Sequence, residues 1–233
     1  MQLRWQFWRK RVLIIDADPQ ANTTSGLNFS PENDQKRTLY EVMIGKIDVR
    51  DALIQTEIAN LHMIPSHINL VGAELELVEA ADRESRIKNA LAPIRDNYDY
   101  IIIDCSPSLG LITINSLTAS DSVMIPVQPE FFALEGLGKL LQTIRLVQAG
   151  PNQSLTIEGF VVTMFDGRTK VHNQVLGELR EHFSEMVFNT IIQRNIRLSE
   201  APSHGKPIIL YDVICNGTTN YLNLAKEVLE KNS

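Results

Sequence analysis

Short apolar runs, rich in β-branched residues, alternate along the chain with longer stretches whose apolar positions recur every three or four residues. The short runs are almost continuously apolar, which is typical of strands covered on both faces in a parallel sheet. They predict strands at residues 12–16, 61–64, 100–104, 122–127, 157–164, 187–192 and 207–210. The longer stretches predict helices at residues 70–81, 84–96, 134–148, 170–183 and 219–231.

This alternation predicts an α/β fold, with a mostly parallel sheet, helices on both of its faces and right-handed crossovers. We expect a single domain over residues 11–233, preceded by an atypical segment at 1–10, and a surface loop over the polar stretch 28–37. In such sheets ligands bind beyond the carboxyl ends of the strands. The residues that directly follow each strand are therefore the candidate functional residues.

The composition excludes several classes of protein. With 44% hydrophobic and 21% charged residues, the chain has enough apolar surface to build a core, which excludes disorder as its main state. Its two cysteines favour a reduced setting over a disulfide framework. No run approaches the roughly 20 apolar residues of a membrane-spanning helix. The net charge is −6, so nucleic acid binding would need a local basic face.

Three carboxylates follow two of the predicted strands. Asp16 and Asp18 come after the first strand, and Asp104 follows the third. Like charges at neighbouring strand ends are costly unless a cation or hydrogen-bond donors offset them, and Mg²⁺ with phosphate oxygens would do so. The alternative is that each aspartate caps a turn. Of two α/β classes with such acids, a phospho-acceptor receiver is disfavoured by the long separation of Asp16 and Asp104, which leaves a nucleotide-triphosphate hydrolase.

Four segments bring a specific resemblance: residues 11–27, which contain Asp-Ala-Asp-Pro-Gln, and residues 98–110, 119–128 and 195–211. From about residue 10 onward the chain resembles the ParA/Soj family of chromosome- and plasmid-partitioning ATPases, which shares the deviant-Walker P-loop fold with MinD. The resemblance implies a P-loop NTPase-like fold, with ATP and Mg²⁺ as cofactors. It also implies catalytic roles near the attacking water for Asp18 and Asp16, and metal-shell roles for Asp104 and Asp16.

The resemblance assigns further residues in the second half of the chain. Gln193, Arg194 and Asn195 lie where the family contacts the nucleotide base, although the family usually has proline in place of Gln193. Arg168 and Arg197 match positions of DNA-contacting arginines. The charges in this region taken alone leave open a second interpretation, in which it is a solvated face with one internal ion pair.

The resemblance also implies partners and a location. These are nonspecific nucleoid DNA, a ParB/Spo0J-like centromere-binding protein and a second copy of the chain when ATP is bound, with no membrane involved. The implied location is the bacterial cytoplasm, associated with the nucleoid. The main rival hypothesis is a non-catalytic ParA-like regulator or an inactive fragment.

One departure from the family pattern is large. The family has a strand, a Lys-Gly-Gly-Val-Gly-Lys-Thr loop and a helix before the strand that matches residues 12–16, and no part of the 233 residues matches Gly-x-x-x-x-Gly-Lys-[Ser/Thr]. The nearest glycine cluster, residues 136–140, falls inside a predicted helix. We therefore expect this Walker A unit to be missing and ATP binding to be doubtful. The basic residues 1–9 are interpreted as an out-of-register or alternative-start peptide, the other hypothesis being a lineage-specific N-terminus.

Overall fold

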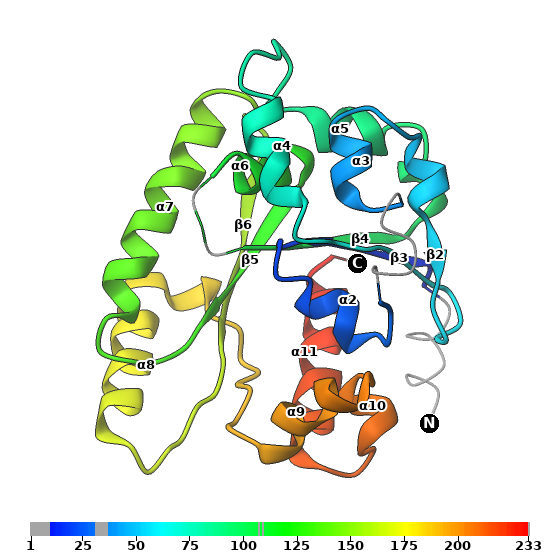
Figure 1. Ribbon diagram of the computed structural model, residues 1–233. Coiled ribbons are helices and arrows are strands. Elements are labelled where there is room, and N and C mark those ends of the chain that lie inside the picture. The colour runs from blue at the N-terminus through cyan, green and yellow to red at the C-terminus, as the bar shows by residue number, and fades with distance from the viewer. Residues whose placement is uncertain (1–9, 31–36, 107, 109, 233) are drawn as a thin grey trace. The chain divides into compact units, whose positions relative to one another are not determined.

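The computed structural model describes residues 10–30, 37–106, 108 and 110–232 (Figure 1). The chain forms two compact units. Unit 1 comprises Met1–Ser120 with Val147–Gln153, and unit 2 comprises Asp121–Leu146 with Ser154–Ser233. The division of the sequence into residues 1–10 and a single domain over 11–233 stays a prediction. Most of the predicted loop 28–37 lies outside the described residues.

Unit 1 contains a four-stranded sheet in the order β2-β3-β1-β4. Strands β1 (Val12–Ala17), β3 (Leu61–Ile64) and β4 (Tyr100–Cys105) are parallel, and the two-residue β2 (Ile54–Gln55) is antiparallel to β3. The three predicted strands are confirmed, and β2 was too short for a pattern to indicate. Within the described part of the sheet β4 is an edge strand, and its central residue Ile102 is 54% exposed.

The helices of unit 1 are short. They are α2 (Asn22–Gly26), α3 (Leu39–Met43), α4 (Leu70–Glu76), α5 (Arg86–Leu91) and α6 (Leu111–Ala119), with 3₁₀ turns at Val49–Ala52 and Arg95–Asn97. Helices α3 to α6 cover one face of the sheet and α2 lies on the other side (Figure 1). Residues Leu13, Ile15, Met43, Ile64 and Leu70 are buried in the core between sheet and helices.

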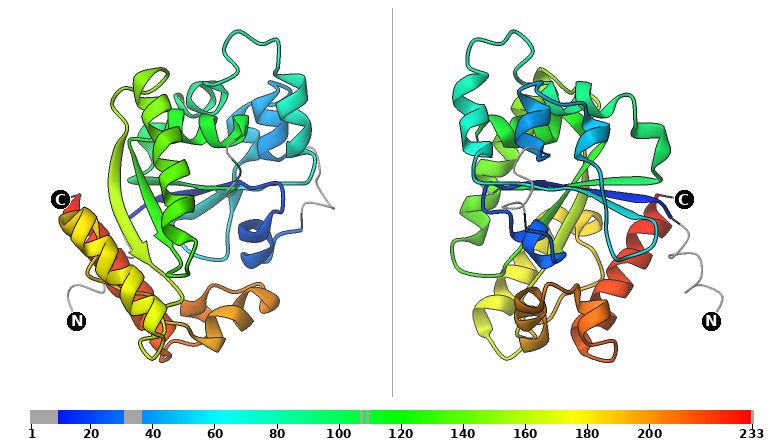
Figure 2. Two further views of the ribbon diagram at one scale, coloured as in Figure 1. Left: turned by 90° about the vertical axis from the view of Figure 1, so that its left-hand side faces the viewer. Right: turned by 45° about the vertical axis from the view of Figure 1, so that its right-hand side comes forward.

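Unit 2 contains two parallel strands, β5 (Ser122–Val127) and β6 (Thr156–Val162). Its helices are α7 (Ala133–Ala149, whose last residues belong to unit 1), α8 (Lys170–Phe183), α9 (Ile196–Glu200), α10 (Ile208–Tyr211) and α11 (Asn216–Lys231), with 3₁₀ turns at Ser184–Met186 and Ala201–His204. Figure 2 gives two further views of these elements, with α8 in yellow and α11 in red. The predicted helices 134–148, 170–183 and 219–231 are confirmed, including the placement of the 136–140 glycine cluster inside α7.

Two predicted strands were wrong. Residues 187–192 run beside β6 but make only one ladder bridge, between Phe160 and Val187. The carboxylate of Glu227 explains this, because it accepts the backbone N–H groups of Asn189 at 2.7 Å and Thr190 at 2.9 Å and so takes them from the ladder. Residues 207–210 fall mostly in helix α10, since a short apolar run cannot be told from a buried helical segment by its pattern.

Candidate active site: carboxylates at the end of a parallel sheet

The register of the sheet brings two of the three candidate acids together. Strands β1 and β4 are in parallel register, with Asp16 opposite Asp104. Asp18 follows β1 by one residue. The expectation that the carboxyl ends of adjacent parallel strands would collect the acids therefore holds within unit 1.

Asp16 is completely buried and fully engaged by its own chain. Its Oδ2 accepts the N–H of Thr24 at 2.8 Å and the hydroxyl of Thr24 at 2.6 Å, and its Oδ1 accepts the N–H of Asp18 at 3.2 Å. Burial raises the pKa of this carboxyl above its ordinary value, against the three hydrogen bonds that lower it. Asp16 thus anchors the loop after β1 and has no exposed surface.

Thr24 is a site residue that sequence reasoning missed. It is completely buried on α2, and its hydroxyl also accepts the N–H of Ser66 at 3.0 Å. One hydroxyl therefore joins the end of β1, helix α2 and the segment that follows β3. Its only sequence signal was its place within the segment 11–27 that carries the family resemblance.

Asp104 and Asp18 differ from Asp16 in being accessible to solvent. The Oδ2 of Asp104 accepts the hydroxyl of Thr23 at 2.5 Å, and the Oδ1 of Asp18 accepts the N–H of Gln20 at 3.0 Å. The pKa of the neighbouring Cys105 thiol is raised, first by burial and then by the charges of Asp104 and Asp18. The end of the sheet is therefore a region of negative potential.

The carboxylates at the end of the sheet fit Mg²⁺ binding through few protein ligands. Within residues 10–30, 37–106, 108 and 110–232 there is no group of three His, Cys, Asp or Glu side chains placed to hold an ion. Both oxygens of Asp16 accept internal hydrogen bonds, so Asp104 is the better exposed acid of the register pair. Mg²⁺ commonly uses one or two carboxylates and completes its shell with water and phosphate oxygens, and these residues match that pattern.

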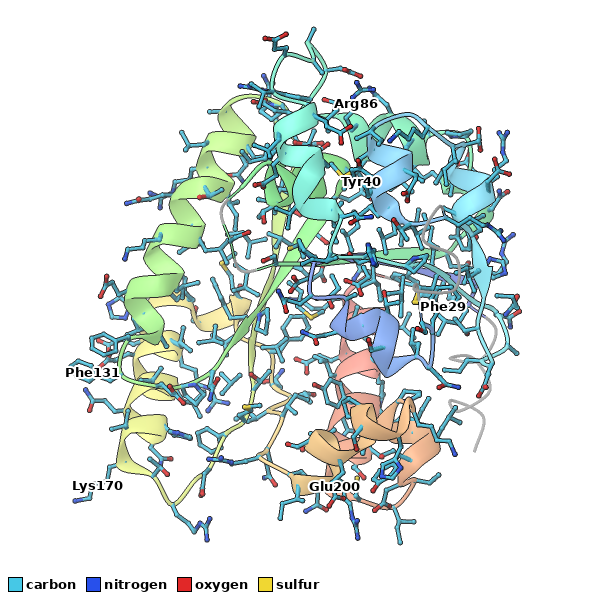
Figure 3. The ribbon with its side chains drawn as sticks, viewed as in Figure 1. Phe29, Tyr40, Arg86, Phe131, Lys170 and Glu200 are labelled. Carbon is cyan, nitrogen blue, oxygen red and sulfur yellow. The ribbon has the colours of Figure 1, made fainter. Side chains whose placement is uncertain are left out.

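A cavity of about 540 Å³ opens beside the acids in unit 1. It begins at the residue after Asp18, and Ala21 in its wall has a left-handed backbone with φ of 53°. Its lining residues are Pro19, Gln20, Ala21, Ser25, Asn28, Phe29, Ser30, His67 and Ile68. Phe29 is labelled in Figure 3. The loop after β1 therefore forms part of the wall of this cavity.

In unit 2 the structure brings together the two segments assigned to base and DNA contacts. Phe165 and Gln193 form a parallel bridge, and the N–H of Arg194 donates to the carbonyl of Phe165 at 3.0 Å. Asn195 starts α9, with its Oδ1 accepting the N–H of Arg197 at 2.9 Å. Gln193 and Arg194 are exposed on this junction.

The two candidate DNA-contacting arginines are both paired with acids of unit 2. Arg168 is 91% exposed and makes a two-pronged contact with Asp166, at 2.9 and 2.7 Å, which holds the pKa of Asp166 well below its ordinary value. Arg197 donates to Glu200 at 2.8 Å and lies 3.5 Å from Asp212. Figure 3 labels Glu200 near the end of α9. The internal ion pair that the sequence suggested as an alternative is present, between Arg197 and Glu200. DNA phosphates would have to compete with Glu200 for this arginine.

Comparison with known proteins places these segments in a family. A family model described as an AAA domain matches residues 5–157. The chain is 55% identical over 219 residues to the sporulation initiation inhibitor protein Soj of Bacillus subtilis, covering 94% of this chain and 86% of Soj. It is 47% identical over 224 residues to the chromosome partitioning protein ParA of Myxococcus xanthus, covering 96% of this chain and 79% of that protein.

Two solved structures of known proteins have a fold similar to that of this chain. Cobyrinic acid a,c-diamide synthase from Mycobacterium smegmatis with bound ATP analog and magnesium is 35% identical, with a TM-score of 0.75 over 87% of this chain and 81% of that one. A plasmid partition protein from Borrelia burgdorferi is 28% identical, with a TM-score of 0.69 over 87% of this chain and 86% of that one. The fold is that of an α/β P-loop NTPase. Within that class, the chain belongs to the Soj/ParA family of chromosome-partitioning proteins. In the part of the chain that the structure describes, no helix is long and apolar enough to cross a membrane.

Proposed function

We propose that this chain acts in the partitioning of a chromosome or plasmid, as an ATP- and Mg²⁺-dependent protein that dimerises on ATP and binds DNA without sequence preference. Its partner would be a ParB/Spo0J-like centromere-binding protein, and its location the nucleoid in the bacterial cytoplasm. The observation that carries the proposal is the register pair Asp16 and Asp104 at the carboxyl end of the sheet, with Asp18 beyond it, in segments shared with the Soj/ParA family.

The three acids would have different roles, because they differ in their exposure to solvent. Mg²⁺, when bound, would neutralise charge on the phosphates of the nucleotide. Asp104 would hold the Mg²⁺ through water, and Asp18 would orient the attacking water from the accessible end of the loop. Asp16, whose oxygens are occupied by Thr24 and Asp18, would contribute to the metal shell and water chiefly by fixing that loop. Gln193, Arg194 and Asn195 would contact the base.

ATP binding by these 233 residues alone should be weak. The phosphates need a loop of backbone N–H groups and a lysine, and the sequence contains no Gly-x-x-x-x-Gly-Lys-[Ser/Thr]. Titration calorimetry with ATP and Mg²⁺ tests this, beside a chimera that carries the strand–loop–helix segment of Soj ahead of Val12. We expect heat of binding and Mg²⁺-dependent hydrolysis from the chimera only, with hydrolysis lost in its Asp104→Asn form. Tight ATP binding with hydrolysis by the 233-residue chain would contradict the expectation that the missing loop is needed, while leaving the proposed ATP-dependent function in place.

DNA binding should depend on Arg168 and Arg197 and fall with salt. Each arginine that contacts a phosphate contributes about one to the slope of log affinity against log salt. In the DNA-binding form of the chimera, Arg197→Ala should lower both the affinity and that slope, measured by fluorescence anisotropy on a random duplex. Arg145→Ala, a change of an exposed arginine on α7, is the matched control. An unchanged slope in Arg197→Ala would remove this residue from the interface.

The second candidate function is a non-catalytic ParA-like regulator. A regulator would bind a centromere-binding protein or DNA equally well with and without ATP. Pull-down of a ParB-like protein by the 233-residue chain, with and without nucleotide, separates the two candidates.

A further inference from the structure

Helix α4 carries an apolar stripe on its outer face. Ile68, Val71, Leu75 and Val78 are spaced by three, four and three residues, which places them on one side of the helix and the turns that extend it. Their exposed fractions are 55%, 50%, 77% and 54%. Figure 1 shows α4 at the outer surface of unit 1. We call these four residues the α4 stripe.

The α4 stripe is separate from the face by which the helix is held in the fold. Leu70, Ala73 and Leu77 lie on the opposite face and are almost completely buried in the core of unit 1. A surface helix of a globular protein ordinarily has one apolar face and one polar face. This helix has two apolar faces, and packing within unit 1 accounts for one of them. A contiguous exposed apolar patch of this kind typically marks an interaction site.

The charges beside the stripe restrict what it can bind. Residues 51–82 contain six acidic residues and no lysine or arginine. At 100° per residue, Glu74 falls on one flank of the stripe and Glu79 on the other. At the far end the Arg83 side chain donates to the carbonyl of Val78 at 2.9 Å, and Arg86 pairs with Asp82 at 3.3 Å. Each flank of the stripe therefore has one glutamate, and neither flank has a lysine or arginine between residues 51 and 82.

We propose that the α4 stripe is the docking surface for a basic amphipathic helix of a partner protein. Three turns of apolar side chains would pack on the stripe, and lysines or arginines at the edges of the partner's apolar face would meet Glu74 and Glu79. A second copy of α4 is a poorer occupant because it would place glutamates against glutamates. Residues 1–9 are basic and apolar, but they lead into the amino end of β1, whereas α4 follows the carboxyl end of β3. This inference does not depend on the proposed nucleotide chemistry.

The test uses the full chain and two designed probes, labelled with fluorescein. The first is an 18-residue helical peptide with leucines in an a/d pattern and lysines beside them, and the second has glutamates in place of the lysines. Fluorescence anisotropy should show micromolar binding of the basic peptide and at least tenfold weaker binding of the acidic one. Adding salt should weaken the basic peptide's binding, since its lysines face carboxylates.

Variants locate the binding on the stripe. Leu75→Gln should weaken the basic peptide at least tenfold, because it removes a large apolar contact from the centre of the stripe. Leu146→Gln, at a leucine that is 72% exposed on α7, is the matched control and should leave binding unchanged. A double change, Glu74→Gln with Glu79→Gln, should reduce affinity severalfold and flatten its salt dependence. Circular dichroism should show all three variants folded, since the altered side chains lie at the surface.

Four results would overturn the proposal. They are equal binding of the two peptides, no binding of the basic peptide, unchanged binding in Leu75→Gln, and binding that emerges only when residues 1–9 are deleted. Sedimentation of the free chain adds a further check. A dimer that Leu75→Gln converts to monomer would show that the stripe is occupied by a second copy and not by a basic helix.

Discussion

The carboxylates of unit 1 and the arginines of unit 2 represent opposite ways of holding charge. Asp16 is buried, and donors from the backbone and from Thr24 occupy both of its oxygens. Arg168 and Arg197 are exposed, and each is balanced by an acid two or three residues away in the chain. The hydrogen bonds of Asp16 are part of the fold, whereas the exposed arginines can exchange their acidic partners for another ligand. Changes in unit 1 should therefore cost stability, and changes in unit 2 should alter binding.

The largest expected effect is that of Asp16→Ala. It leaves the N–H groups of Thr24 and Asp18 and the hydroxyl of Thr24 without their acceptor in a buried place, which should lower the free energy of unfolding by about 3 kcal/mol. Urea denaturation followed by circular dichroism measures the change. Asp16→Asn, which keeps one acceptor oxygen, should lose less. Equal stability of Asp16→Ala and the wild type would mean that this carboxylate is not built into the fold.

Thr24→Val should have the next largest effect, with a loss of about 2 kcal/mol on unfolding by urea. The substitution keeps the shape of the side chain but removes the hydroxyl that donates to Asp16 and accepts from Ser66. Thr24→Ser restores that hydroxyl and should recover most of the stability. If serine and valine behaved alike, packing of the methyl group and not the hydrogen bonds would be responsible.

A smaller effect concerns pH. The pKa of Asp16 is raised in the folded protein from 3.8, chiefly by burial, so the folded state binds this proton more tightly than the unfolded chain does. The contribution of Asp16 to the free energy of unfolding should therefore decrease as pH rises from 3.8 through the raised folded-state pKa. The difference in unfolding free energy between wild type and Asp16→Asn, measured from about pH 4 to about pH 8, should show this fall. A difference that grew toward neutral pH would reverse the sign of the shift.

The smallest effect on stability is expected in unit 2. Arg168→Ala and Arg197→Ala should leave the urea midpoint unchanged, because exposed ion pairs contribute little to folding. Asp166→Asn should instead raise the affinity of the DNA-binding chimera for duplex DNA, since it releases Arg168 from its two-pronged contact. Anisotropy at two salt concentrations measures this. A marked loss of stability in either alanine variant would erase the contrast between the two units.

The sequence predicted the three parallel strands of unit 1 and the position of the acids at their ends, because short β-branched runs alternating with helical stretches favour buried parallel strands. It could not show that Asp16 is buried and Asp104 exposed, because the burial of two register partners depends on the elements packed around them and not on the local pattern. It also missed Thr24, whose hydrogen bonds to Asp16 and Ser66 join residues up to 42 positions apart. The failed strand at 187–192 has the same cause, as Glu227 reaches it from α11, 37 and 38 positions away.

Strand β4 has a practical consequence for anyone handling this protein in solution. One side of it pairs with β1, while the described sheet leaves its other row of backbone N–H and C=O groups without a strand beside the half-exposed Ile102. Such an edge is a template for the corresponding edge of another molecule. Yield on refolding should therefore fall as protein concentration rises, and a lysine in place of Ile102 should improve solubility more than the same change at a fully buried strand position.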